Sequence, residues 1–187
     1  MDIEEFRLQF IDELRFNAEH EGTEPEHQFI EKTLADLEEI GELNDPIPMS
    51  VELRGARNRI LAFDAYSYDD ADGSLVLIAS DFSNQRDVPP TLTNTRIEEL
   101  YARMLNFIDE SVKGNISKYC DDSDPALIIA NEFRKKIGKG MLSTEILRFK
   151  FLIVSNATLS KQVKNLSKPD FLERPVELNV WTLERFY

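Results

Sequence analysis

Cysteine and histidine are scarce in this chain, and lysine is missing from a long internal stretch. No lysine occurs between Lys32 and Lys113. The single cysteine, Cys120, cannot form an internal disulfide and is too few for a cysteine zinc site, which fits a reducing compartment. The two histidines, His20 and His27, have no cysteine or nucleophile placed with them, so we assign them no catalytic or metal-binding role.

Long apolar runs and phosphate-binding loops are also missing. No stretch approaches the roughly 20 apolar residues of a membrane span, and the N-terminus M-D-I-E-E-F is acidic, unlike a secretory signal. Neither the loop G-x-x-x-x-G-K followed by Ser or Thr nor G-x-G-x-x-G occurs, which excludes nucleotide sites of those two types. We therefore predict a cytoplasmic protein without membrane contact. Its 187 residues, 42% hydrophobic and 30% charged, are enough for a single domain over residues 1–187.

Negative charge is concentrated at the N-terminus. Residues 1–45 hold 15 acidic residues against three basic ones, although the whole chain has a net charge of −13. Residues 113–174 hold 12 basic residues against seven acidic ones, so a basic surface is expected within an acidic protein. A solvated face is the alternative to phosphate binding here. The candidate nucleic-acid-binding residues are Lys135, Lys136, Lys139, Lys161, Lys164 and Lys168.

The acidic segment 1–45 is predicted to be a pair of helices. Apolar residues recur at three- and four-residue spacing from residue 3 to 14, with Asp2 as N-cap and an end near Gly22. Thr23 and Glu26 are spaced as a capping box for a second helix, which should end at Gly41.

A β-hairpin over residues 59–82 is predicted to organise the sheet-containing core, residues 46–187. Two runs rich in β-branched, aromatic and aliphatic residues flank a polar loop, whose Asp72-Gly73 pair suits a turn with positive φ. In the second run both alternating faces are mostly apolar, so this strand should be central and covered on both sides. A short strand over residues 49–53 should precede the hairpin.

The C-terminal half reads as two helices followed by strand, helix and strand. A capping box of Thr95 and Glu98 opens the first helix, and Asp124 caps the second, which ends near Gly138. Strands are predicted over residues 146–154 and 175–181, and a short helix containing Leu159, Val163 and Leu166 should join them as parallel neighbours. If that helix forms, Lys161, Lys164 and Lys168 lie along one of its faces.

This order of elements resembles the restriction-endonuclease-like fold, an α/β fold with a mixed sheet. A closer resemblance rests on four stretches of the sequence. They are R-G-A-R before F-D-A-Y-S-Y-D-D, then D-G-S-L-V-L-I-A-S-D-F, L-I-V-S-N-A-T-L-S and the ending V-W-T-L-E-R-F-Y. With these motifs the chain resembles the N-terminal domain of AIPR proteins, the abortive-infection phage-resistance family, over nearly its whole length. The resemblance implies that this domain is the N-terminal part of a longer phage-defence protein.

The endonuclease-like resemblance implies a carboxylate site on the hairpin. Nucleases of that fold place an Asp on one arm and an acid-x-Lys triplet on the other, so that the acids hold Mg²⁺ and the lysine helps to position the nucleophile. Asp64 matches the first acid, and Asp81 stands at the end of the second arm. Neither Ala79-Ser80-Asp81 nor Asp81-Phe82-Ser83 supplies the lysine. Candidate replacement cations are Arg57, Arg59, Arg86 and Lys150.

Two functions follow from this pattern. The first is a non-catalytic recognition or assembly module without a cofactor, in which Arg57, Arg59 or Ser80 satisfies the aspartates. The second is a nuclease with a rearranged site, in which Asp64 and Asp81 bind Mg²⁺. The partner is expected to be the rest of a longer chain or another protein, with nucleic acid as the alternative. The sequence leaves the oligomeric state open.

Overall fold

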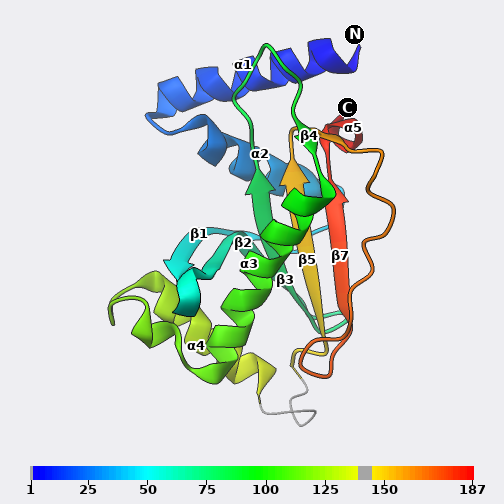
Figure 1. Ribbon diagram of the computed structural model, residues 1–187. Helices are drawn as coiled ribbons and strands as arrows, with labels where there is room; N and C mark the ends of the chain where they lie inside the picture. Colours follow the sequence, from blue (N-terminus) through cyan, green and yellow to red (C-terminus); the bar gives the residue numbers. More distant parts are fainter. Residues whose placement is uncertain (1, 139–144) are drawn as a thin grey trace.

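The computed structural model describes residues 2–138 and 145–187 (Figure 1). Its helices and strands alternate in the order expected of a mixed α/β fold. Along the chain they are α1 (Ile3–Glu21), α2 (Pro25–Glu39), β1 (Ile47–Arg54), η1 (Ala56–Asn58), β2 (Ile60–Asp69), β3 (Ser74–Asp81), β4 (Thr91–Leu92), α3 (Asn94–Lys113), η2 (Ile116–Lys118), α4 (Pro125–Ile137), β5 (Arg148–Ser155), β6 (Thr158–Leu159), β7 (Val176–Trp181) and α5 (Leu183–Phe186).

The main sheet is mixed and flanked by helices, as predicted. Among the described residues it has five strands in the order β1-β2-β3-β5-β7. The first three strands pair antiparallel, whereas β3, β5 and β7 run parallel. A separate parallel pair joins β4 to β6. No helix in the described ranges is long and apolar enough to cross a membrane.

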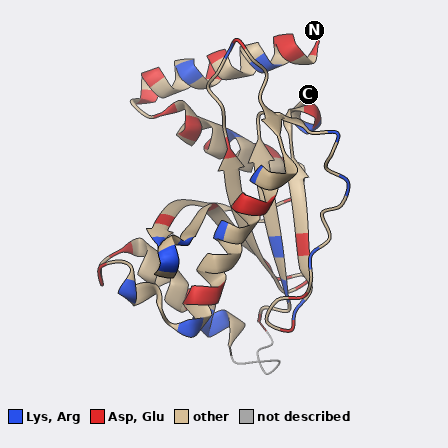
Figure 2. Cartoon of the chain, viewed as in Figure 1, with Lys and Arg blue, Asp and Glu red and all other residues tan. Residues whose placement is uncertain are grey.

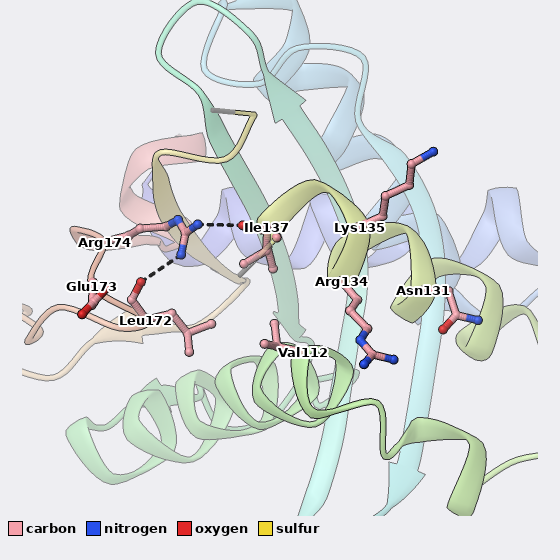
Figure 3. A pocket seen from close by; sticks show the side chains of 9 residues that line it. Val112, Asn131, Arg134, Lys135, Ile137, Leu172, Glu173 and Arg174 are labelled. Carbon is pink, nitrogen blue, oxygen red and sulfur yellow. Dashed lines mark hydrogen bonds between the residues drawn. The ribbon is translucent and has the colours of Figure 1, made fainter. Parts of the chain in front are cut away.

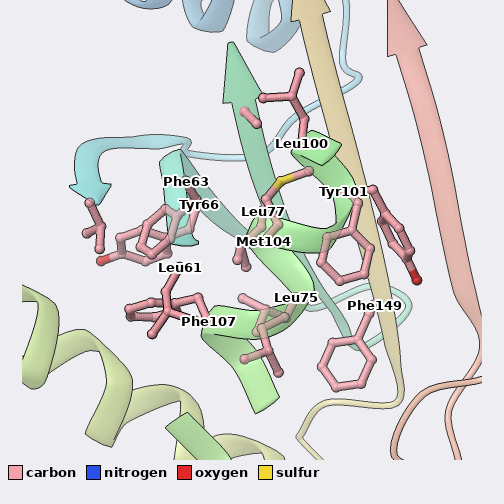
Figure 4. Close-up of a cluster of buried hydrophobic side chains, with 14 of the residues drawn as sticks. Leu61, Phe63, Tyr66, Leu75, Leu77, Leu100, Tyr101, Met104, Phe107 and Phe149 are labelled. Atoms are coloured by element: carbon pink, nitrogen blue, oxygen red, sulfur yellow. The ribbon is translucent and has the colours of Figure 1, made fainter. Parts of the chain in front are cut away.

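Strand β3 is central and covered on both sides, which confirms the prediction for the second arm of the hairpin. Every residue from Ser74 to Ser80 is buried. On one face Leu75 and Leu77 pack with side chains from α3, such as Met104, as Figure 4 shows. On the other face Val76 and Ile78 pack against the apolar sides of α1 and α2. The sheet therefore separates two apolar clusters.

The ends of the helices follow the sequence closely at some termini and not at others. Asp2 caps α1 by accepting from the Glu5 N–H at 2.8 Å, and Gly22 ends that helix with φ 68°. Asp124 caps α4 by accepting from the Ala126 N–H at 2.8 Å, and Gly138 follows the last turn. These four terminal assignments are confirmed.

Both predicted capping boxes are wrong. Glu24, not Thr23, is the N-cap residue of α2, and the Thr23 hydroxyl accepts from the Gln28 side chain at 3.1 Å. Helix α3 is capped by Thr93, which accepts from the Arg96 N–H at 3.3 Å, so it begins before the expected Thr95. In both segments a neighbouring residue enters the extended N-cap conformation instead.

The helix predicted around residues 159–166 is also wrong, since the chain there forms β6 and then irregular structure. Local side chains compete with helical hydrogen bonding: Ser160 Oγ accepts from the Gln162 N–H, and Asn165 Oδ1 from the Ser167 N–H at 2.8 Å. Strands β5 and β7 are nevertheless parallel, as predicted.

Replacing Ile78 with alanine tests the central position of β3. Ile78 is 1% exposed between two packed layers, so the substitution should lower the free energy of unfolding by about 2 to 5 kcal/mol, because the cavity cannot collapse. The matched control is Ile128→Ala in α4, where the side chain is 65% exposed. Urea unfolding of both variants checks this, and equal midpoints for Ile78→Ala and the parent would contradict a buried central strand.

Candidate functional site

Asp64 lies where β2 separates from β3. The Cα pairing of these strands runs from Ala65 opposite Ile78 to Asp69 opposite Ser74, so Asp64 is just beyond it. One oxygen of Asp64 accepts from both the backbone N–H of Ser80 at 2.7 Å and its hydroxyl at 3.0 Å. The carboxylate thus links the two arms of the hairpin in place of strand pairing.

Asp81 lies at the end of β3 and is held by two other elements. Its Oδ1 accepts from Arg96 Nε at 2.8 Å, an ion pair with the first turn of α3. The Ser155 hydroxyl of β5 is 2.8 Å from the Asp81 carbonyl oxygen and 3.3 Å from Oδ2. Asp81 therefore joins β3, β5 and α3.

The ion pair between Asp81 and Arg96 is the first of a series along the surface of α3. Arg96 also binds Glu99 at 3.0 Å, and Glu99 in turn pairs with Arg103. The result is an alternating series of charges, Asp81, Arg96, Glu99 and Arg103. Hydrogen bonds from Arg96 and, to a smaller extent, from Arg103 hold the pKa of Glu99 below its ordinary value.

Sequence reasoning identified Ser80 as a partner for the aspartates but missed Arg96. The expected donor Arg59 instead pairs with Glu110 at 2.9 Å. Two other candidate cations form ion pairs elsewhere, Arg86 with Asp12 and Lys150 with Asp72. The spacing of Arg96, Glu99 and Arg103 on one helical face was the available signal.

Arg57 does not contribute to this site either. It lies in η1 with a left-handed backbone, φ 57°, and its side chain is exposed. None of the hydrogen bonds to Asp64 or Asp81 found among the described residues comes from it. The arginine that reaches the aspartates comes from α3 rather than from the hairpin.

Glu26 and Glu52 are two further carboxylates at this site. A small cleft of about 110 Å³ is lined by Glu26 from α2, Asp64 and Ser80 from the hairpin, and Arg96 and Arg103 from α3. Burial raises the pKa of Glu26, and the negative charges of Asp64 and Asp81 raise it further. Sequence reasoning assigned Glu26 only to a capping box.

Burial dominates the electrostatics of Asp64. It raises the pKa of this carboxyl, and the hydrogen bonds from the Ser80 N–H and hydroxyl offset part of that effect. Across residues 2–138 and 145–187, no three His, Cys, Asp or Glu side chains are arranged to hold a metal ion.

The candidate nucleic-acid-binding lysines form two separate groups rather than one strip. Lys135 and Lys136 belong to α4, whereas Lys161, Lys164 and Lys168 follow β6 along the irregular segment, on the other side of the view in Figure 2. Lys139 lies outside the described residues.

Two of these lysines bind within the domain. Lys136 lies 3.8 Å from Glu145 and 4.5 Å from the ring centroid of Tyr68. Lys168 pairs with Glu98 and lies 5.0 Å from the ring centroid of Tyr101. Lys135, Lys161 and Lys164 are exposed and have no ion pair with another described residue.

The family comparison matches the abortive infection phage resistance protein N-terminal domain to residues 29–187. The chain belongs to this family. It is therefore a domain of a phage-defence protein. Within the abortive infection phage resistance domain, Asp64, Asp81 and Arg96 fall inside the matched residues, whereas Glu26 and all of α1 precede them. No curated protein and no solved structure matches the chain.

The raised pKa of Asp64 predicts a pH-dependent effect of Asp64→Asn. The folded domain holds the Asp64 proton more tightly than the unfolded chain, whose ordinary value is 3.8, so Asp64 destabilises the fold increasingly as pH rises through its folded pKa. Asparagine keeps an acceptor for Ser80 and does not titrate. The free energy of unfolding of Asp64→Asn, relative to the parent, should therefore increase from about pH 4 to about pH 7.

Urea unfolding at several pH values measures this difference. The control is Asp70→Asn, which removes the same charge from an exposed position in the hairpin loop. A difference for Asp64→Asn that stays constant or falls over this pH range would contradict the assigned direction of the shift.

Proposed function

We propose that this abortive infection phage resistance domain is a non-catalytic recognition or assembly module, with a restriction-endonuclease-like fold that has lost the nuclease site. The observation that carries the proposal is the Asp81 to Arg96 ion pair at 2.8 Å. Where a nuclease of that fold would present a lysine beside its acids, this domain places an arginine from α3 directly on the second acid.

The chemistry of arginine supports this choice. Its guanidinium keeps its proton and spreads its charge over a planar fork, so it cannot exchange a proton with a water nucleophile as a lysine can. Here the fork is already shared between Asp81 and Glu99. Arg96 thus acts as a cross-link between the hairpin and α3.

The hydrogen bonds of Asp64 also support a framework role. A buried carboxylate needs partners to remain charged, and Asp64 has both the N–H and the hydroxyl of Ser80. A metal ion at this oxygen would compete with these two donors.

A divalent-metal-dependent nuclease with a rearranged site is the second candidate. It is favoured by the small cleft that Glu26 and Asp64 line together, where burial and then the negative charge of Asp64 raise the pKa of Glu26. Under this candidate Asp64 and Asp81 would supply oxygen ligands to Mg²⁺ once Asp81 has left Arg96, and the ion would activate water for attack on a phosphodiester.

The proposed partner is another protein or the remainder of a longer chain, and the proposed location is the cytoplasm. Nucleic acid is the alternative partner, and Lys135, Lys161 and Lys164 are its candidate contacts because their side chains are exposed. Phosphate contact by these lysines would make affinity fall steeply as salt is added.

Metal titration and a cleavage assay separate the two candidates. The proposed module should show no Mg²⁺- or Mn²⁺-dependent stabilisation, whereas a metal site would add about 2.7 kcal/mol at a hundredfold excess over its dissociation constant. It should also leave single- and double-stranded DNA and RNA intact.

Asp64→Asn is the decisive variant, with Asp70→Asn as its exposed control. Cleavage that requires a divalent ion, is lost in Asp64→Asn and survives in Asp70→Asn would overturn the non-catalytic proposal and establish the nuclease. A metal-dependent melting shift with the same pattern across the two variants would show that the carboxylates bind the ion.

A further inference from the structure

A second cavity, of about 650 Å³, lies far from the carboxylates, between the C-terminal ends of α3 and α4 and the segment 171–174 (Figure 3). Its walls are largely apolar, with Val112 from α3, Ile137 from α4 and Leu172 from the loop. Polar residues of α4 also line it, namely Asn131, Arg134 and Lys135. This size and this mixture of an apolar wall with a few polar groups are typical of small-molecule sites.

The wall formed by Leu172 is a strained turn. Phe171 and Arg174 exchange both backbone hydrogen bonds, at 2.9 and 3.0 Å, and between them Leu172 and Glu173 have φ 49° and 62°. Residues with side chains rarely adopt this left-handed conformation, and backbone strain of this kind concentrates at functional sites.

A buried arginine holds the strained turn in place. Arg174 donates to the carbonyl oxygens of Ile137 and Ile146 at 2.7 Å each, and to that of Leu172 at 2.9 Å. The turn is therefore tied to the end of α4 and the segment before β5. The Leu172 wall is thus fixed before any ligand arrives, which lowers the ordering cost of binding.

Arg134 brings an uncompensated positive charge to the opposite wall. Its side chain is exposed, and its guanidinium has no hydrogen-bond acceptor or ion pair among the described residues. Figure 3 shows it beside Val112. The neighbouring Lys135 also lines the cavity, but its side chain extends away from it in the same view. The guanidinium rests on Gly114, where a Cβ atom would come within 2.7 Å of it.

We propose that this cavity binds a small amphiphilic anion. Its apolar body packs against Val112, Ile137 and Leu172, and its single carboxylate or phosphate group pairs with the fork of Arg134. Glu173 lies at the other end of the cavity from Arg134 (Figure 3), so a second negative group there is disfavoured. The proposal is independent of the carboxylate site.

Titration with eight-carbon probes tests the charge and the location together. Octanoate and octyl phosphate are the anionic probes, and octylamine is the cation of matched length. At least one anion should bind with one-to-one stoichiometry and shift the amide resonances of Val112 and Leu172. Arg134→Met should weaken that binding about tenfold or more, because a charged hydrogen bond is lost. Lys135→Met is the matched control and should bind as the parent does.

A variant that fills the cavity distinguishes binding inside the cavity from binding of the anion to the protein surface. Val112→Phe should abolish binding while the melting transition shows that the domain remains folded; if the domain unfolds, Val112→Leu replaces it. Tighter binding of one anion identifies the head group, and either anion supports the proposal. Equal binding of octylamine, equal loss in Arg134→Met and Lys135→Met, or no binding of either anion would overturn it.

Discussion

Burial of β3 on both faces is the constraint on which the rest of this domain depends. A strand covered on both sides must supply apolar residues to two layers, and Leu77 and Ile78 face opposite clusters. Its two neighbours come from different parts of the chain, β2 by a tight hairpin and β5 from beyond α4. Both helical layers therefore assemble around one eight-residue strand.

Polar groups at the end of the buried strand β3 need hydrogen-bond partners within the protein. A charged carboxylate without hydrogen bonds is costly to bury, and the two aspartates meet that requirement in different ways. Asp64 accepts from Ser80 of the adjacent arm, whereas Asp81 pairs with Arg96 of the covering helix. The first contact closes the hairpin, and the second fixes α3 to the sheet. Both carboxylates thus help to hold the elements of the fold together.

The hairpin, the central strand and the parallel C-terminal strands could be predicted because each leaves a local pattern. Alternation and an Asp-Gly turn mark the hairpin, and apolar residues on both faces mark a strand covered twice. The helix near residue 160 could not be excluded, because apolar spacing does not show that Ser160 and Asn165 bind the backbone instead.

The partner of Asp81 could not be assigned from sequence, because several arginines were within reach of the hairpin and spacing along the chain does not select among them. Arg59 lies closer to the hairpin in sequence than Arg96 does, yet it pairs with Glu110 on α3. The choice depends on how α3 packs on the sheet, because that packing brings Arg96 to Asp81 at the end of β3.

The chain leaving β3 is fixed from two sides, which limits how the carboxylate site can rearrange. Asn156 accepts from the Ser83 N–H at 2.9 Å and donates to its carbonyl at 2.8 Å. Beyond it, the fully buried Arg7 of α1 donates to the carbonyls of Gln85 and Arg86 at 2.7 Å each. Freeing Asp81 for a metal ion would break its pair with Arg96 while both anchors hold the backbone still. The energetic cost of that rearrangement is one argument for the proposed recognition role, in which Asp81 keeps its pair with Arg96.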